Sequence, residues 1–194
     1  SYYYLWQQED WKRSTRPRGE DPLIGIYSGT DPHVIENHID WAVAHGIEAF
    51  VVTFDSTNVQ EIHETLSNVT NINKIKIVLQ YASIPVNKAG SFGEHLNWNQ
   101  EANAQWCLKV LRTASSTFFA EPWYLRVNGL PAMVFAVTRT WKGLNHIVIN
   151  RMKGTMGNFY GIGDHVYWET TPQKQLHLGK SFFDAYTAQN MFAS

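Results

Sequence analysis

Residues 46–54 read Gly46-Ile-Glu-Ala-Phe-Val-Val-Thr-Phe54, a glycine that leads into an almost unbroken run of apolar, β-branched and aromatic residues. This composition predicts a strand, Ala49–Phe54, that is buried on both faces, as the strands of parallel sheets are. The preceding residues predict a helix, because Asp31 and Pro32 supply an N-cap and a proline for the first turn, and Gly46 supplies a stop. A helix followed by a buried strand indicates an α/β fold.

The same unit recurs along the chain. We expect further strands at Tyr2–Trp6, Leu23–Tyr27, Ile75–Tyr81, Ala132–Val137, His165–Glu169 and Phe183–Thr187, and further helices at Asn58–Val69, Asn99–Ser115 and Gly143–Lys153. Strands that alternate with helices indicate a parallel sheet, either open and doubly wound or closed into a barrel. No glycine-rich nucleotide-binding pattern follows any of these strands, and a barrel is therefore preferred.

The number of strands is too small for a closed barrel. We count about six strand–helix units, roughly two fewer than a (β/α)8 barrel contains. The sequence therefore predicts an α/β protein of the TIM-barrel type, incomplete, with residues 1–194 forming a single domain. If the barrel is truly incomplete, its apolar sheet edges are left uncovered, and in that case we expect a homodimer that closes the opening.

The composition excludes several classes of partner. Charged residues make up 17% of the chain and the formal net charge is -1, so no general field attracts nucleic acid. No stretch has the length and apolarity of a membrane span, and the histidines lack metal-ligand spacing. The single cysteine, Cys107, lies among apolar residues of an expected helix and is interpreted as a buried, inert thiol. We expect no metal and no cofactor.

Four stretches of the sequence carry a resemblance to a known family. They are Tyr3-Tyr-Leu-Trp6, Pro22-Leu-Ile-Gly-Ile-Tyr-Ser-Gly-Thr-Asp-Pro-His-Val-Ile35, Glu121-Pro-Trp-Tyr-Leu-Arg-Val-Asn-Gly-Leu-Pro-Ala-Met-Val-Phe135 and Phe183-Asp-Ala-Tyr-Thr-Ala-Gln-Asn-Met191. In this order they resemble glycoside hydrolase family 99 and its WbsX-like relatives. The resemblance implies a (β/α)8 barrel, a glycan or polysaccharide substrate and, for the hydrolases, endo-acting cleavage of α-mannosidic linkages with retention. It favours a secreted, periplasmic or secretory-lumen protein over a cytoplasmic one.

The chain also departs from the family pattern. The family's acid/base residues lie in a later Asn-Glu-Trp-x-Glu-Gly segment, which we expect beyond Ser194, and Gln80 stands where relatives often have an acidic residue. Three interpretations remain open. The chain is either a piece of a longer glycoside hydrolase or a reduced, non-catalytic barrel that binds glycans. A structural partner that uses exposed aromatic surface is a third.

The candidate site residues follow from the barrel geometry, in which the working face is formed by the carboxyl ends of the strands. Asp55 and Glu169 are the carboxylates that we nominate as a catalytic pair; the alternative is that both are solvated loop residues. Arg139 follows an apolar strand and could bind sugar hydroxyls through its planar fork, or else pair with Glu169 or Asp184.

Aromatic and amide side chains complete the predicted substrate site. Trp6, Tyr27 and Tyr81 could stack on sugar rings, but the same residues equally fill ordinary cores. Gln80 and Tyr186 lie at or near expected strand ends and are added as substrate-binding candidates.

Overall fold

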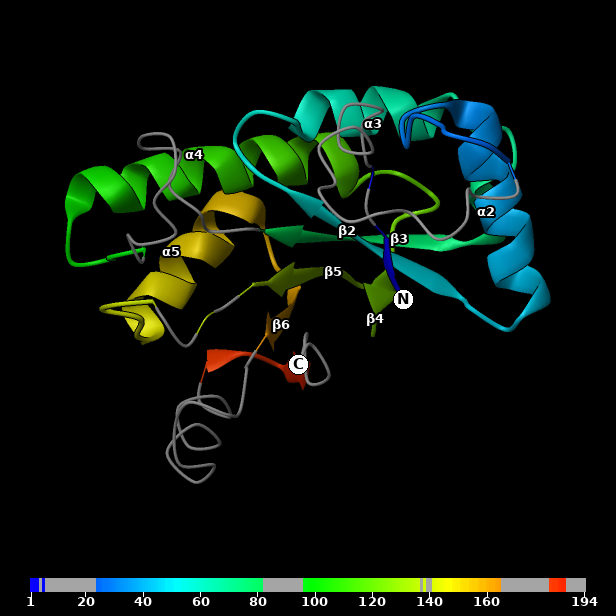
Figure 1. Ribbon diagram of the computed structural model, residues 1–194. Coiled ribbons are helices and arrows are strands. Elements are labelled where there is room, and N and C mark those ends of the chain that lie inside the picture. Colours follow the sequence, from blue (N-terminus) through cyan, green and yellow to red (C-terminus); the bar gives the residue numbers. More distant parts are fainter. Residues whose placement is uncertain are drawn as a thin grey trace, which may run out of the picture.

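A computed structural model describes residues 1–3, 5, 24–81, 96–136, 138, 141–164 and 182–187, with the backbone alone at Asp164, Tyr186 and Thr187. Its centre is a parallel sheet, and the helices among these residues lie on one face of it (Figure 1).

The order of the strands follows the chain without a reversal. The parallel strands are β1 (Tyr2–Tyr3), β2 (Ala49–Phe54), β3 (Lys76–Tyr81), β5 (Leu130–Phe135), β6 (Tyr160–Asp164) and β7 (Ala185–Thr187), each paired with the next. A doubly wound sheet would change direction at a switch point and place helices on both faces. Continuous winding with helices on one face is the arrangement of a barrel wall. The sheet is thus part of a TIM barrel.

The helices fill the connections between these strands. They are α2 (Pro32–Ala44), α3 (Val59–Ser67), α4 (Glu101–Phe118) and α5 (His146–Met156), with a short 3-10 helix, η1 (Ile72–Lys74), before β3. The start of α2 confirms its sequence signal, because the Asp31 side chain accepts a hydrogen bond of 2.9 Å from the backbone N–H of His33. The end of α2 also confirms its sequence signal, because Gly46 takes the left-handed conformation, with a φ of 77°.

The main core lies between the helices and the outer face of the sheet. Alternate residues of β2, Phe50, Val52 and Phe54, are buried in it, and β3 and β5 contribute side chains in the same way. The residues between them face the inner side of the sheet. There Val78, Ala132 and Val134 form a second, smaller apolar cluster.

A short hairpin, formed after α4, leads into β5. Strand β4 (Arg126–Val127) runs antiparallel to β5, and the loop before it pairs with the start of β3 at Ile77. The buried hydroxyl of Tyr124 donates a hydrogen bond of 2.6 Å to the carbonyl of Ala132 and accepts one of 3.3 Å from the backbone N–H of Leu79. Tyr124 therefore bridges the two strands with its side chain.

One expected strand is absent, one observed strand was not expected, and one expected strand lies outside the described residues. The segment expected as a strand at Leu23–Tyr27 forms turns and bends over residues 24–27, because Gly25 has a φ of 74°, which no extended strand permits. Strand β6 was not expected, since Gly161 and Gly163 interrupt its apolar pattern. The strand expected at His165–Glu169 lies outside the described residues.

Candidate functional site

A row of residues crosses the inner face of the sheet near the carboxyl ends of its strands. The pairing places Thr53 beside Gln80, Gln80 beside Val134, Val134 beside Ile162 and Ile162 beside Ala185. In a parallel sheet, residues paired in this way point to the same face. The described part of the row therefore has a polar end on β2 and β3 and an apolar end on β5, β6 and β7.

The polar end of the row is a hydrogen-bonded pair. The hydroxyl of Thr53 donates to Oε1 of Gln80 at 2.8 Å, and Gln80 is only 1% exposed. A buried amide keeps its position only when its polar atoms are partnered, so the Thr53 contact fixes which way the Gln80 side chain points. Thr53 is partly exposed, so its hydroxyl is the group of this pair that a hydroxylated ligand could reach.

Asp55 lies directly after β2 and organises the turn into α3. Its Oδ1 accepts hydrogen bonds from the backbone N–H of Thr57, at 2.7 Å, and from the hydroxyl of Thr57, at 2.6 Å. Its own N–H donates to Oδ1 of Asn58 at 2.9 Å. These contacts support the alternative of a loop carboxylate. The proposed partner of Asp55, Glu169, lies outside the described residues, and the pair is untested.

Tyr81 points toward the helices and not toward the inner face. Its side chain is fully buried, its ring centre lies 5.5 Å from that of Phe54, and burial raises its pKa. Cys107 of α4 shares this environment, and burial raises the pKa of its thiol to about 12, which agrees with an inert cysteine. In this position Tyr81 is a core residue, and it offers no exposed ring face to a sugar.

Tyr27 packs against α2. Its half-buried ring stands edge-on to His38, with 5.4 Å between the ring centres, in the outer helical layer. Asp184, named above as a possible partner of Arg139, precedes β7, and its Oδ2 accepts a hydrogen bond of 2.8 Å from the N–H of Gly161. The backbone of Tyr186 lies in β7 beside Gly163. Trp6 and Arg139 lie outside the described residues.

Two loops that follow β3 and β5 meet at the carboxyl edge of the sheet. Residues 96–98 pair with Lys142 through two backbone hydrogen bonds of 2.8 Å, and the buried rings of Trp98 and Trp141 lie 5.8 Å apart. Trp98 is not among the site residues that the sequence predicted. The tryptophan between two asparagines, just before a helix start, was the signal that could have drawn attention to it.

The described residues contain no group of three histidine, cysteine, aspartate or glutamate side chains that could hold a metal ion. Within the same residues, no helix is long and apolar enough to cross a membrane.

Comparison with solved structures identifies the fold. The structure of the GH99 endo-α-mannosidase from Bacteroides thetaiotaomicron matches 97% of the chain with a TM-score of 0.67 and 14% sequence identity. The same enzyme in complex with bis-tris-propane matches with a TM-score of 0.64 and 13% identity. A glycoside hydrolase-like protein matches 86% of the chain, with a TM-score of 0.64 and 16% identity. No protein-family model and no curated protein matches the chain.

The chain is therefore similar in fold to part of a GH99 barrel. It spans 60%, 57% and 51% of the lengths of these three structures. The predicted family resemblance and the barrel-type fold are confirmed at the level of structure, whereas activity and substrate stay predictions.

Proposed function

We propose that this chain forms part of a glycoside hydrolase that cleaves a mannose-containing or related glycan internally, with retention of configuration. The observation that supports this best is the match of 97% of the chain to a GH99 endo-α-mannosidase. The sugar would lie along the carboxyl edge of the sheet, where Thr53 and Gln80 are each one residue before the end of their strand.

Trp6, Arg139 and Glu169 belong to the same proposal. Trp6 would stack on a sugar ring, Arg139 would donate to sugar hydroxyls, and Glu169 would supply a carboxylate. Each was selected because it follows an expected strand, and barrel enzymes collect their site residues from such positions.

Hydrolysis is tested with α-mannan as the substrate. Both the 194-residue chain and the complete product of its reading frame are incubated with α-mannan, and released oligosaccharides are separated by chromatography. Internal cleavage predicts oligosaccharides of several lengths from the start of the reaction, and proton NMR shows whether the new reducing end is first formed as the α-anomer. If neither protein releases any oligosaccharide from a mannose-containing glycan, the proposed reaction is wrong.

A second candidate is a glycan-binding barrel without catalysis. Two observations favour it: Gln80 is a neutral amide on the inner face, and the Asp55 carboxylate is engaged in the turn that precedes α3. This candidate predicts saturable binding of manno-oligosaccharides in calorimetry, with the same oligosaccharide recovered intact. Binding with product formation would favour the hydrolase, and absence of both would reject the two candidates together.

Two substitutions locate the glycan. Trp6→Ala and Arg139→Lys should each weaken binding about tenfold, because they remove a stacking face and a planar hydrogen-bonding fork. Trp41→Ala is the matched control, since Trp41 lies on α2 with 47% of its surface exposed. Equal losses in all three variants would show that the sugar does not bind where we place it.

A further inference from the structure

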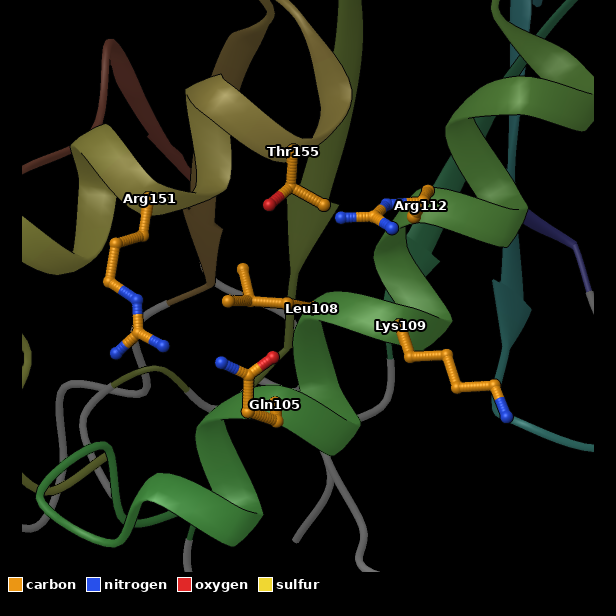
Figure 2. A pocket seen from close by; sticks show the side chains of 6 residues that line it. All are labelled: Gln105, Leu108, Lys109, Arg112, Arg151 and Thr155. Carbon is orange, nitrogen blue, oxygen red and sulfur yellow. The ribbon is translucent and has the colours of Figure 1, made fainter.

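A surface pocket lies between the outer helices α4 and α5, on the side of the helical layer away from the sheet. It has a volume of about 260 Å³ and is lined by Gln105, Leu108, Lys109, Arg112, Arg151 and Thr155 (Figure 2). Leu108 is nearly buried and forms an apolar base, and polar side chains surround it. This pocket is separate from the carboxyl edge of the sheet that the proposed function uses.

The two arginines of the pocket come from different helices. Arg112 extends from α4 toward Thr155 of α5, and Arg151 of α5 lies on the other side of Leu108, near Gln105 (Figure 2). A ligand that entered between the helices would therefore meet a guanidinium on each side and a hydroxyl on the α5 wall. Lys109 lines the pocket with its aliphatic stem, while its ammonium group points outward.

The charges of the pocket are not balanced by the described residues. Glu101 pairs with Arg151 through two hydrogen bonds of 2.7 and 3.2 Å, and Gln105 also donates to Glu101 at 2.7 Å. These hydrogen bonds, that from Arg151 first, hold the pKa of Glu101 below its ordinary value, so the carboxylate stays ionised. No ion pair within the described residues includes Lys109 or Arg112. The guanidinium groups of Arg112 and Arg151 thus bring two positive charges to the pocket against the single negative charge of Glu101, while the Lys109 ammonium group lies further out.

We propose that this pocket binds a phosphate group, either free or as a monoester on a small molecule. A phosphate group carries more than one negative charge at neutral pH, which is opposite in sign to the excess positive charge that the two arginines leave in the pocket. Its oxygens accept several hydrogen bonds at once, and arginine binds them in bidentate fashion. Arg112, the N–H groups of Arg151 that Glu101 does not occupy, and the Thr155 hydroxyl supply these donors. The volume suits a small ligand and is below that of typical pockets for larger molecules.

Calorimetry with two probes tests the proposal. Inorganic phosphate and glucose 6-phosphate are titrated separately into the 194-residue protein in a phosphate-free buffer, with sodium chloride of equal ionic strength as the reference. Saturable heat with either phosphate probe, above that of chloride, is expected. Tighter binding of glucose 6-phosphate would assign the pocket to a monoester, and tighter binding of inorganic phosphate would assign it to the free ion. No saturable heat with either probe would overturn the proposal.

Substitutions place the binding in this pocket. Arg112→Gln should weaken phosphate binding about tenfold or more, because it removes a charged donor, and Arg112→Lys should restore part of the affinity. The matched control is Lys153→Gln, which removes the same charge from α5 at a residue that does not line the pocket. If Arg112→Gln does not fold, as judged by circular dichroism, Thr155→Val replaces it. Equal losses for the pocket and control variants would overturn the proposal, since net charge alone would then explain the binding.

Discussion

The hydroxyl oxygen of Tyr3 lies 2.8 Å from Nδ1 of His38, so one hydrogen bond joins strand β1 to helix α2. Burial raises the pKa of Tyr3, which therefore stays a hydroxyl, and burial lowers the pKa of His38, which favours its neutral form. The ring of Tyr3 also stacks on Phe50 of β2, with 4.4 Å between the ring centres.

This contact predicts a loss of stability in mild acid. The folded-state pKa of His38 lies below the unfolded value of about 6.5, so the unfolded chain takes up a proton first as the pH falls. Stability that is complete above pH of about 6.5 should therefore decline below it. Urea unfolding measures the free energy of unfolding at pH 7.5 and at pH 5.5. Between these two pH values this free energy should fall less in His38→Gln than in the unchanged protein. An identical decline in both proteins would mean that other groups cause the pH dependence.

Removing the Tyr124 hydroxyl should weaken the connection between β3 and β5. Tyr124→Phe keeps the ring in the core but leaves the carbonyl of Ala132 and the N–H of Leu79 without this partner. We expect the free energy of unfolding to fall by about 1–3 kcal/mol. Chemical denaturation measures the loss, and hydrogen exchange at the Leu79 amide should accelerate more than exchange at the centre of α4. Unchanged exchange at Leu79 would contradict the bridging role.

Two glycines should respond in opposite directions to the same substitution. A Cβ atom at Gly161 would lie 3.1 Å from the rings of Phe159 and Phe183, so Gly161→Ala should destabilise the protein by about 1–3 kcal/mol. Gly154 lies in α5 with open space around the corresponding position, so Gly154→Ala should stabilise it by about 0.5–1 kcal/mol. Thermal unfolding of both variants tests this, and a shift of the same sign in both would be against the packing that we describe at β6.

The Thr53 and Gln80 pair should matter for glycan binding. Thr53→Val keeps the shape of the side chain but removes the hydroxyl that orients Gln80. We expect the affinity for manno-oligosaccharides to fall about tenfold, which corresponds to about 1.4 kcal/mol. Calorimetry measures this, and Thr65→Val on α3 is the control. Full affinity in Thr53→Val would exclude this end of the row from the sugar site.

The sequence predicted the elements whose boundaries have a local chemical cause. The Asp31 cap, Pro32 and Gly46 define α2, and an unbroken apolar run defines β2. Strand β6 was missed because Gly161 has to be small for a reason that appears only in the folded protein, where the ring of the nearby Phe159 and that of Phe183, much later in the chain, both pack against it. No local pattern contains that information.

The candidate site was harder to predict, because both faces of a parallel sheet are apolar and the sequence does not show which face a residue takes. Gln80 and Tyr81 are adjacent and were nominated together, yet the alternation of the strand puts Gln80 on the inner face and Tyr81 under the helices. The buried amide was the informative signal, since a polar residue in an apolar strand needs a partner. Its partner, Thr53, follows only from the pairing of β2 with β3.

The consecutive order of the strands affects how the protein can be made. Every parallel strand from β2 to β7 pairs with the parallel strand that precedes it in the chain, so each one finds its neighbour already synthesised when it leaves the ribosome. The sheet can then grow in step with translation, one strand and one covering helix at a time. During this growth the newest strand always forms an unpaired edge, which exposes the nascent chain to aggregation or chaperone binding until the next strand is added.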